Sequence, residues 1–318
     1  MKNLFEMMKT SAYLICFIVS VCLYACSNEN QDIPSDTLKS GQIEIKVNPG
    51  KNNDVSFTAI ADKITIDWGD GHVEQFTGYS TPLSHSYANQ DLKTITIQTE
   101  KLVWFATILE LMSIDGQLTW GYFREMRFGE MNTLARLTIG CPTLSVLEIE
   151  KASALIQFNL SGQLLTSFDV SGLTALEEFH CSDNSFTSLD LRSLHTLKTF
   201  ACVNNPLTSL DLRGLTSLIT LSCASNQLTT LNLTGCTSLG SIDCSRNQLT
   251  SLDISGLTSL SNLLCFNNQL SSNTLNTIFE NLPERTGTSM LIIENNPGFD
   301  TCNREIAINK GWYFGRLG

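Results

Sequence analysis

Five cysteines recur at a constant interval in this chain. They are Cys181, Cys202, Cys223, Cys244 and Cys265, each 21 residues after the one before. Redox and metal chemistry favour paired or C-x-x-C thiols, and a secreted chain favours disulfides. One thiol per interval suits none of these, because side chains in a single column run parallel and meet poorly for a disulfide. The spacing therefore predicts that these thiols fill a core.

The other groups that could do chemistry form no recognised catalytic set. The histidines are His72, His85, His180 and His195, and none belongs to an H-E-x-x-H sequence. The G-x-S-x-G, P-loop and dinucleotide-binding patterns are also absent from the sequence. The nearest polar cluster is His180 with Glu178 and Asp183. We therefore predict that the chain is not an enzyme and uses no cofactor and no metal ion.

The elements that position these residues follow from the 21-residue period. Such a period predicts a solenoid, in which one coil cannot bury its apolar face alone and stacks on its neighbours about 4.8 Å away. Five asparagines keep the same step: Asn184, Asn205, Asn226, Asn247 and Asn268. We expect their amides to turn inward and bond to backbone groups, each of which would cost about 1 to 3 kcal/mol if buried unpaired.

The unit from Leu215 to Gly235 resembles the leucine-rich repeat, L-x-x-L-x-L-x-x-N-x-L, with Cys223 in place of one leucine. The resemblance covers about half of the chain and implies a coiled ribbon with a parallel sheet on its concave side. In each unit a second segment, such as Leu231-Asn232-Leu233, alternates with period two. It is expected to close the coil on the convex side without a helix.

The region 41–100 alternates apolar and polar residues, which predicts β-strands. Asp67-Trp68-Gly69-Asp70-Gly71, followed by His85-Ser86-Tyr87, resembles the PKD-type immunoglobulin-like sandwich. We expect Trp68 to pack inside and Asp70-Gly71 to form a hairpin turn. A calcium site at Asp67 and Asp70 is the alternative, but calcium takes six or more oxygen ligands and only two carboxylates are present.

The first residues have the features of a targeting segment, with Lys2 and Lys9 before an apolar run too short to span a bilayer. Leu23-Tyr24-Ala25-Cys26 resembles a bacterial lipobox, which implies cleavage before Cys26 and a lipid on it. An ordinary signal peptide is the alternative. The residues that follow resemble export signals of Bacteroidetes lipoproteins. These resemblances imply an outer-membrane lipoprotein, exposed on a Gram-negative cell, that contacts the membrane only through Cys26.

The predicted fold class is mainly β with few helices. A leucine-rich repeat solenoid of 21-residue coils follows a small immunoglobulin/PKD-like β-sandwich, and a C-terminal α/β cap closes it. The expected parts are a lipoprotein signal peptide (1–25), a flexible tether (26–40), a PKD-like β module (41–100), the solenoid (101–272) and the cap (273–318). The cap is expected to contain helices at 272–282 and 301–309 and a strand at 290–293. Cys141 and Cys302 have no partner that the sequence assigns.

The faces of the solenoid hold the candidate binding residues. The concave face is small, polar and nearly free of aromatics. Its candidate partner-binding residues are Glu178, His180, Asp183, Asp243, Arg246, Asn262 and Phe266. On the convex side a column of aspartates, Asp169, Asp190, Asp211 and Asp253, would attract divalent cations or form a solvated face partly paired with arginine, and we favour the second.

Three functions remain open. The charge balance of 20 Lys and Arg against 31 Asp and Glu opposes nucleic-acid binding. The favoured function is a surface lipoprotein that binds a protein on a host or neighbouring cell, as the resemblance to internalin-like repeats implies. A glycan-binding accessory of a polysaccharide-utilisation system is the alternative, suggested by the PKD-like region and opposed by the lack of concave aromatics. A structural spacer is the third possibility.

Overall fold

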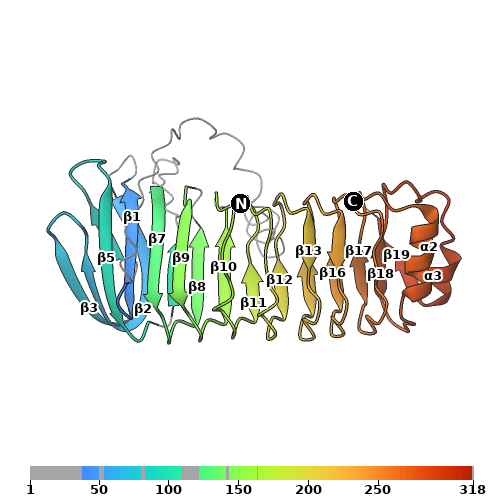
Figure 1. The fold of residues 1–318 in the computed structure, drawn as a ribbon, viewed down its shortest axis with the longest axis horizontal. Helices are drawn as coiled ribbons and strands as arrows, with labels where there is room; N and C mark the ends of the chain where they lie inside the picture. Colours follow the sequence, from blue (N-terminus) through green and yellow to red (C-terminus); the bar gives the residue numbers. More distant parts are fainter. Residues whose placement is uncertain are drawn as a thin grey trace, which may run out of the picture. The chain divides into compact units, whose positions relative to one another are not determined.

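A computed structural model describes residues 38–49, 54–79, 83–102, 104–108, 122–140, 143–162 and 164–316. From Leu38 onward the chain forms one compact unit. The expected signal peptide, the lipobox with Cys26, nearly all of the expected tether, and Cys141 lie outside the described residues. Figure 1 shows a succession of strands that ends in two short helices.

One long parallel sheet runs through the unit. It consists of β6 (Trp104–Ile108), β8 (Arg136–Gly140), β10 (Gln157–Ser161), β11 (Glu178–His180), β12 (Thr199–Ala201), β14 (Thr220–Ser222), β16 (Ser241–Asp243), β17 (Asn262–Leu264), β18 (Ser289–Ile292) and β19 (Trp312–Phe314). From β8 to β17 each strand pairs with residues 21 positions away; Leu221, for example, lies between Phe200 and Ile242. The described coils therefore confirm the predicted β-solenoid.

Strands also lie on the opposite side of some coils. They are β7 (Tyr122–Glu130) paired with β9 (Val146–Lys151), and β13 (Ser209–Asp211) paired with β15 (Thr230–Asn232), both pairs parallel. The corner that follows requires a positive φ, which glycine adopts without strain. Gly214 and Gly235 have φ angles of 77° and 83° there. As predicted, no helix is needed within the repeat.

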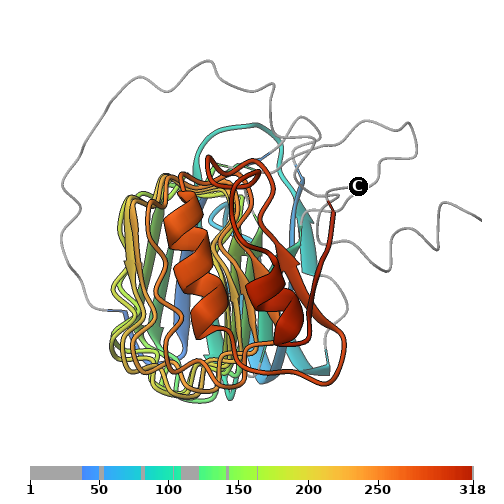
Figure 2. The ribbon, with the colours of Figure 1, turned by 90° about the vertical axis from the view of Figure 1, so that its right-hand side faces the viewer.

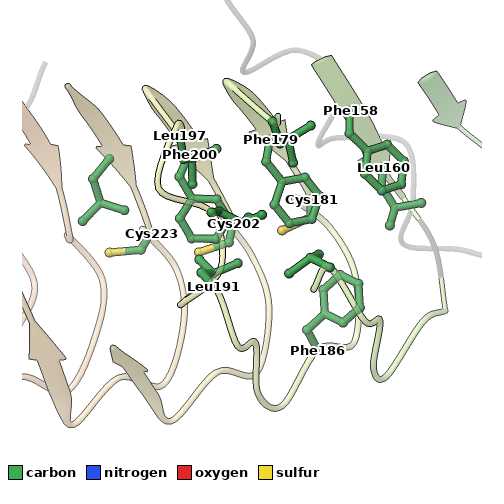
Figure 3. Packing of buried hydrophobic residues seen from close by; sticks show 14 of the residues in the cluster. Phe158, Leu160, Phe179, Cys181, Phe186, Leu191, Leu197, Phe200, Cys202 and Cys223 are labelled. Atoms are coloured by element: carbon green, nitrogen blue, oxygen red, sulfur yellow. The ribbon is translucent and has the colours of Figure 1, made fainter. Parts of the chain in front are cut away.

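The core is built from rows of equivalent residues. Phe158, Phe179 and Phe200 are buried and stack with ring centroids 5.4 and 5.7 Å apart. Figure 3 shows Phe179 and Phe200 beside the thiols of Cys181 and Cys202, and Phe158 beside Leu160. All five cysteines of the 21-residue column are fully buried. The thiols therefore fill core space between larger apolar side chains.

The asparagine column bonds neighbouring coils together. Nδ2 of Asn226 donates to the carbonyl oxygens of Cys202, Cys223 and Ala224 at 2.9, 3.1 and 3.1 Å, and its Oδ1 accepts from the N–H of Leu207 at 3.2 Å. Equivalent bonds are made by Asn205, Asn247 and Asn268. Because one amide contacts its own coil and the preceding coil, the column both satisfies buried backbone groups and fixes the coil spacing.

The antiparallel strands before residue 101 are hydrogen-bonded to the solenoid. They are β1 (Gln42–Asn48), β2 (Asp54–Asp67), β3 (Val73–Tyr79), β4 (Leu83–Ser86) and β5 (Lys93–Glu100). β1 lies between β5 and β7, and β2 pairs with β6 as well as with β3, β4 and β5. Both sides of the first coils are thus continued by paired strands, which leaves their edges covered.

The C-terminal end contains two further coils with helical connections. α2 (Ser272–Asn281) begins after the N-cap residue Ser271, and α3 (Glu305–Asn309) precedes β19. Figure 2 looks at this end and shows both helices over the last coils. The step from Leu263 to its partner Leu291 is 28 residues because α2 lies between them. Asn296 nevertheless continues the asparagine column, since its Nδ2 donates to the carbonyl oxygen of Cys265 at 3.0 Å.

Basic and aromatic side chains close this end by bonding to backbone carbonyls. Arg285 donates to the carbonyl oxygens of Leu260 and Thr258 at 2.7 Å through Nη2. Nε1 of Trp312 donates to the carbonyl oxygen of Pro283 at 2.8 Å. Each of these side chains therefore ties its own coil to the coil before it, at a place where the connections depart from the regular repeat.

Replacing Asn226 with alanine should destabilise the chain by roughly 2 to 4 kcal/mol, because several buried backbone groups lose their partner at once. The matched control is Gln227→Ala, which removes the adjacent, exposed amide. Urea unfolding followed by circular dichroism measures both. A loss for Asn226→Ala no larger than that for Gln227→Ala would refute the role given to the asparagine column.

Candidate functional site

The outward face of the parallel sheet is formed by alternate residues of each strand. In β14, for example, Leu221 points inward, while Thr220 and Ser222 point outward. Because the register is constant, outward residues form rows across the strands. The first row contains Glu178, Thr199, Thr220, Ser241, Asn262, Met290 and Tyr313, and the second contains His180, Ala201, Ser222, Asp243, Leu264 and Ile292.

The structure places six of the predicted binding residues on or beside this face. Glu178, His180, Asp243 and Asn262 point outward from β11, β16 and β17. Asp183 and Arg246 occupy the corner after the strand, where their φ angles are 57° and 54°. Glu178 and His180 lie together in β11, whereas Asp243 and Arg246 lie in and after β16, with β12 and β14 between the two strands.

Phe266 corrects the expectation of an exposed aromatic ring. Only 8% of its surface is exposed, and the equivalent residues Ala224 and Ser245 are also buried. These three residues lie where the chain turns into the corner. The guanidinium carbon of Arg246 lies 5.9 Å from the centroid of the Phe266 ring, within cation–π range.

The polar outward groups are held by bonds within the face. Nε2 of Gln157 donates to Oε2 of Glu178 at 2.8 Å, and Oγ of Ser245 donates to Oδ1 of Asp243 at 2.6 Å. Burial lowers the pKa of the His180 imidazole. A neutral, half-buried imidazole with no nucleophile bonded to it has no catalytic partner among the described residues.

The last three strands change the character of this face. Leu264, Met290, Ile292 and Tyr313 point outward from β17, β18 and β19, and we call these four residues the apolar patch. Tyr313 is 47% exposed, Leu264 and Met290 are half-buried, and Ile292 is 7% exposed. The equivalent residues of the preceding coils are mostly threonine, serine and asparagine or aspartate. A change from polar to apolar side chains on a regular outer face is typical of a contact surface.

A glycine extends the apolar patch towards the edge of the sheet. Gly315 follows β19, and a Cβ added to it would lie 3.0 Å from Cγ1 of Ile292 and 3.1 Å from Sδ of Met290. Without a side chain at this position, those two residues lie over the end of β19. Sequence reasoning missed Met290, Ile292 and Tyr313 as outward residues, and the signal that reveals their rows is the register of β18 with β17.

The aspartate column on the opposite side caps turns. Oδ1 of Asp169 accepts from the N–H of Ser171 at 2.8 Å, and the same bond to the residue two positions on is made by Asp190, Asp211, Asn232 and Asp253. Such Asx turns are a structural use of aspartate. Arg192 also forms a bidentate pair with Asp190, and its hydrogen bonds lower the pKa of that carboxyl to about 2. The favoured interpretation, a solvated face partly paired with arginine, therefore describes the surroundings of Asp190 and Asp211.

A second polar cluster lies in the antiparallel sheet around Trp68. Its Nε1 donates to Oε2 of Glu74 at 2.9 Å, and its backbone oxygen accepts from the Tyr87 hydroxyl at 2.8 Å. The imidazole of His85 stacks on Trp68 and bonds to Oδ2 of Asp70 at 2.7 Å. Trp68 is fully buried, as expected, and the bond between Asp70 and His85 fastens the turn to β4.

The described residues contain neither a metal-binding group nor paired thiols. No three or more His, Cys, Asp or Glu side chains among them gather in a way that could hold a metal ion. Their cysteines are all free thiols. Burial raises the pKa of the Cys265 thiol to about 12 and that of the Cys181 thiol well above its ordinary value, so both remain protonated at neutral pH.

A cavity of about 430 Å³ lies at the C-terminal end, lined by residues that include Glu284, Arg285, Thr286 and Lys310. Arg285 bonds to backbone carbonyls, as described above, and Nζ of Lys310 donates to the carbonyl oxygen of Leu282 at 2.8 Å. The basic groups of this cavity therefore serve the closure of the end. Separately, none of the helices in the described ranges has the length and apolar composition needed to cross a membrane.

Comparison with known proteins gives likenesses among solved structures. No protein-family model and no curated protein matches the chain. The functional domain of InlJ from Listeria monocytogenes, described as including a cysteine ladder, is 27% identical over 56% of this chain and 38% of that chain, with a TM-score of 0.46. The internalin InlF from the same species is 19% identical over 59% of this chain and 62% of that chain, with a TM-score of 0.47.

A third similar structure is the Toll–Spätzle complex from Drosophila, which is 17% identical over 52% of this chain and 30% of that chain, with a TM-score of 0.33. The chain spans less than two thirds of the length of each of these three structures.

The burial of the cysteine column predicts a clear order of thiol reactivity. In the folded chain at neutral pH, iodoacetamide should label Cys302, which is partly exposed, and leave Cys181, Cys202, Cys223 and Cys244 unlabelled. Mass spectrometry of the tryptic peptides measures this, and the same reaction in denaturant, where every thiol should react, is the control. Equal labelling of Cys302 and Cys223 in the folded chain would contradict the assigned packing.

The Asp70 and His85 pair predicts a pH-dependent contribution to stability. The hydrogen bond from His85 lowers the pKa of the Asp70 carboxyl from its ordinary 3.8. A carboxylate with a lowered folded-state pKa stabilises the fold above its ordinary pKa, and the effect is lost as the pH falls through the lowered value. Asp70→Asn should therefore lower the melting temperature at neutral pH and have less effect in strong acid.

The control for this prediction is Asp62→Asn, which removes an exposed ion pair with Lys101. Exposed pairs contribute little, so this change should be nearly silent at every pH. A melting-temperature difference for Asp70→Asn that stays constant between neutral and strongly acidic pH would show that the carboxylate does not act through its charge.

Proposed function

We propose that this protein is a non-enzymatic scaffold that binds a protein partner through the outward face of its parallel sheet, and that a lipid on Cys26 holds it at the cell surface. The observation that supports binding is the apolar patch. Leu264, Met290 and Tyr313 remain accessible, although the same rows are polar in the preceding coils. Apolar side chains kept at a regular outer surface gain free energy when a partner covers them.

The stacked coils suit this task because they hold the face rigid. Each outward residue is flanked by a backbone that is hydrogen-bonded on both sides, from β8 to β18. The asparagine column fixes the corner beside the face. A surface that is already ordered loses little conformational entropy on binding, so more of the contact energy appears as affinity.

A protein partner suits the patch better than a glycan. Three of its four side chains are aliphatic, and aliphatic groups pack against the apolar anchors of a protein surface. Sugar rings instead favour open aromatic platforms, and Tyr313 is the only aromatic residue of the patch. Phe266, the other aromatic candidate, is buried. A glycan ligand is retained as an outcome that the experiment below detects.

Attachment through Cys26 is part of the same proposal. Leu23, Ala25 and Cys26 match the lipobox pattern, and the polar residues from Ser27 onward would separate the anchor from the first strand. Such an arrangement would leave the outward face free of the membrane. The partner would then be a protein on a host or neighbouring cell.

Photo-cross-linking on intact cells tests this function. A photoreactive amino acid in place of Met290 should yield a protein adduct after illumination. The same group in place of Thr230, on the opposite side of the coil, should yield none. Cys26→Ser should move the chain from the membrane fraction to the medium or periplasm.

Each arm has an outcome that opposes the proposal. Equal yields of adduct from positions 290 and 230 would show that the outward face of the sheet is not the specific binding surface. An adduct that a glycosidase abolishes and a protease does not would identify a glycan ligand. Membrane retention of the Cys26→Ser variant would overturn the lipid anchor.

A further inference from the structure

Strand β3 forms an open edge at one end of the described unit. It pairs with β2 alone among the described strands, and it lies at the end opposite to α2 and α3 (Figure 1). None of the residues from Val73 to Thr77 is buried, and Val73 itself is 55% exposed. This edge is therefore accessible to another polypeptide strand.

Every second residue of β3 directs its backbone hydrogen-bonding groups away from β2. The N–H of Trp68 donates to the carbonyl oxygen of His72 at 3.0 Å, and bonded pairs recur at every second residue of an antiparallel ladder. The bonds to β2 therefore continue at Glu74 and Phe76. The residues whose N–H and C=O groups face away from β2 are Val73, Gln75 and Thr77. Within the described ranges these backbone groups have no hydrogen-bond partner, so they can bond to an added strand.

The sequence of β3 does little to block such pairing. It reads Val-Glu-Gln-Phe-Thr-Gly-Tyr, which contains neither the proline nor the lysine that often protects an edge, and which is rich in strand-forming residues. The single charge belongs to Glu74, on the same face as the buried Ile66. Nε1 of Trp68 donates to this carboxylate at 2.9 Å and lowers the pKa of Glu74, so the group is ionised at neutral pH. A strand that pairs with β3 must therefore place no carboxylate opposite Glu74.

A second copy of β3 meets this condition. In a symmetric antiparallel pair, all seven residues of the strand overlap when the twofold axis passes beside Phe76, its central residue. Glu74 then lies opposite Gly78 of the second copy, and the two carboxylates stay apart. Phe76 lies opposite its own equivalent, so two half-buried rings come together. The strand is thus complementary to itself in the register that makes the most backbone hydrogen bonds.

We propose that two copies of this chain associate through antiparallel pairing of their β3 strands, centred on Phe76. The pairing continues one sheet from copy to copy and satisfies the backbone groups at the edge. It also covers the exposed part of each Phe76 ring. The apolar patch lies towards the other end of the described unit, so both patches of the dimer remain available to the proposed protein partner.

Disulfide trapping on intact cells tests both the pairing and its register. In the proposed ladder Gln75 lies opposite Thr77 of the second copy, with a Cα separation of about 5.5 Å that suits a disulfide. The two copies of Gln75 lie diagonally, roughly 7 to 8 Å apart, which is beyond that reach. All trapping variants also carry Cys302→Ser, because the Cys302 thiol is partly exposed.

Cells that produce differently tagged Gln75→Cys and Thr77→Cys chains should form a mixed disulfide dimer under a mild oxidant, and either variant alone should form little. The control is Thr230→Cys, an exposed position on a strand far from β3. A mixed dimer no more abundant than the Thr230→Cys dimer would overturn the proposed pairing. A disulfide adduct to a chain of different mass, without the mixed dimer, would show that another protein occupies the edge and would overturn the second copy.

A second pair of variants tests the backbone bonds without adding thiols. Gln75→Pro removes an N–H that faces away from β2, and proline is tolerated at such edge positions. Gln75→Ala removes the side chain and keeps the N–H. In sedimentation of the purified full chain, Gln75→Pro should raise the dimer dissociation constant by about tenfold or more, and Gln75→Ala by less than about threefold.

Thermal melting establishes that both variants are folded, and the disulfide test decides the proposal if the proline variant is not. Equal dissociation constants for folded Gln75→Pro and Gln75→Ala would contradict the assigned backbone bonds. An unmodified chain that stays monomeric at every concentration would overturn the dimer. Neither result would bear on the cross-linking from position 290, which tests the proposed function separately.

Discussion

The side-chain amide of the asparagine column is the interaction on which the rest of this structure depends. At each corner the backbone leaves the sheet and exposes carbonyl and N–H groups that no strand can satisfy. One buried amide, such as that of Asn226, bonds to carbonyls of two consecutive coils and to an N–H of the earlier one. Since an unpaired buried group is costly, the corner is stable only when the coils keep this spacing.

Fixed spacing has consequences on both sides of the coil. Inside, equivalent side chains stack in rows, which lets phenylalanine rings, leucines and thiols fill the core in turn. On the side opposite the sheet, aspartates cap the turns. The outward face of the sheet bears none of these duties. Its residues are therefore free to vary, and they do so most over β17, β18 and β19.

The ends of the stack satisfy the same requirement in different ways. At the front, antiparallel strands pair with the first coils, and the cluster around Trp68 secures the turn between β2 and β3. At the back, α2 and α3 change the length of the connection, while Arg285 and Trp312 bond to backbone carbonyls of the coil before their own. The apolar patch arises next to this irregular end, where the repeat no longer dictates each outward residue.

The 21-residue period was sufficient to predict the coil, the inward cysteines and the bonding role of the asparagines, because each depends on a position that recurs along the chain. The burial of Phe266 and the apolar patch were decided only by tertiary structure. The patch joins Leu264 to Met290, Ile292 and Tyr313 across connections of changed length. The 21-residue spacing therefore does not reveal that these residues share rows. Periodicity is a property of the chain, whereas exposure depends on which neighbours cover a side chain, and those neighbours are set by packing.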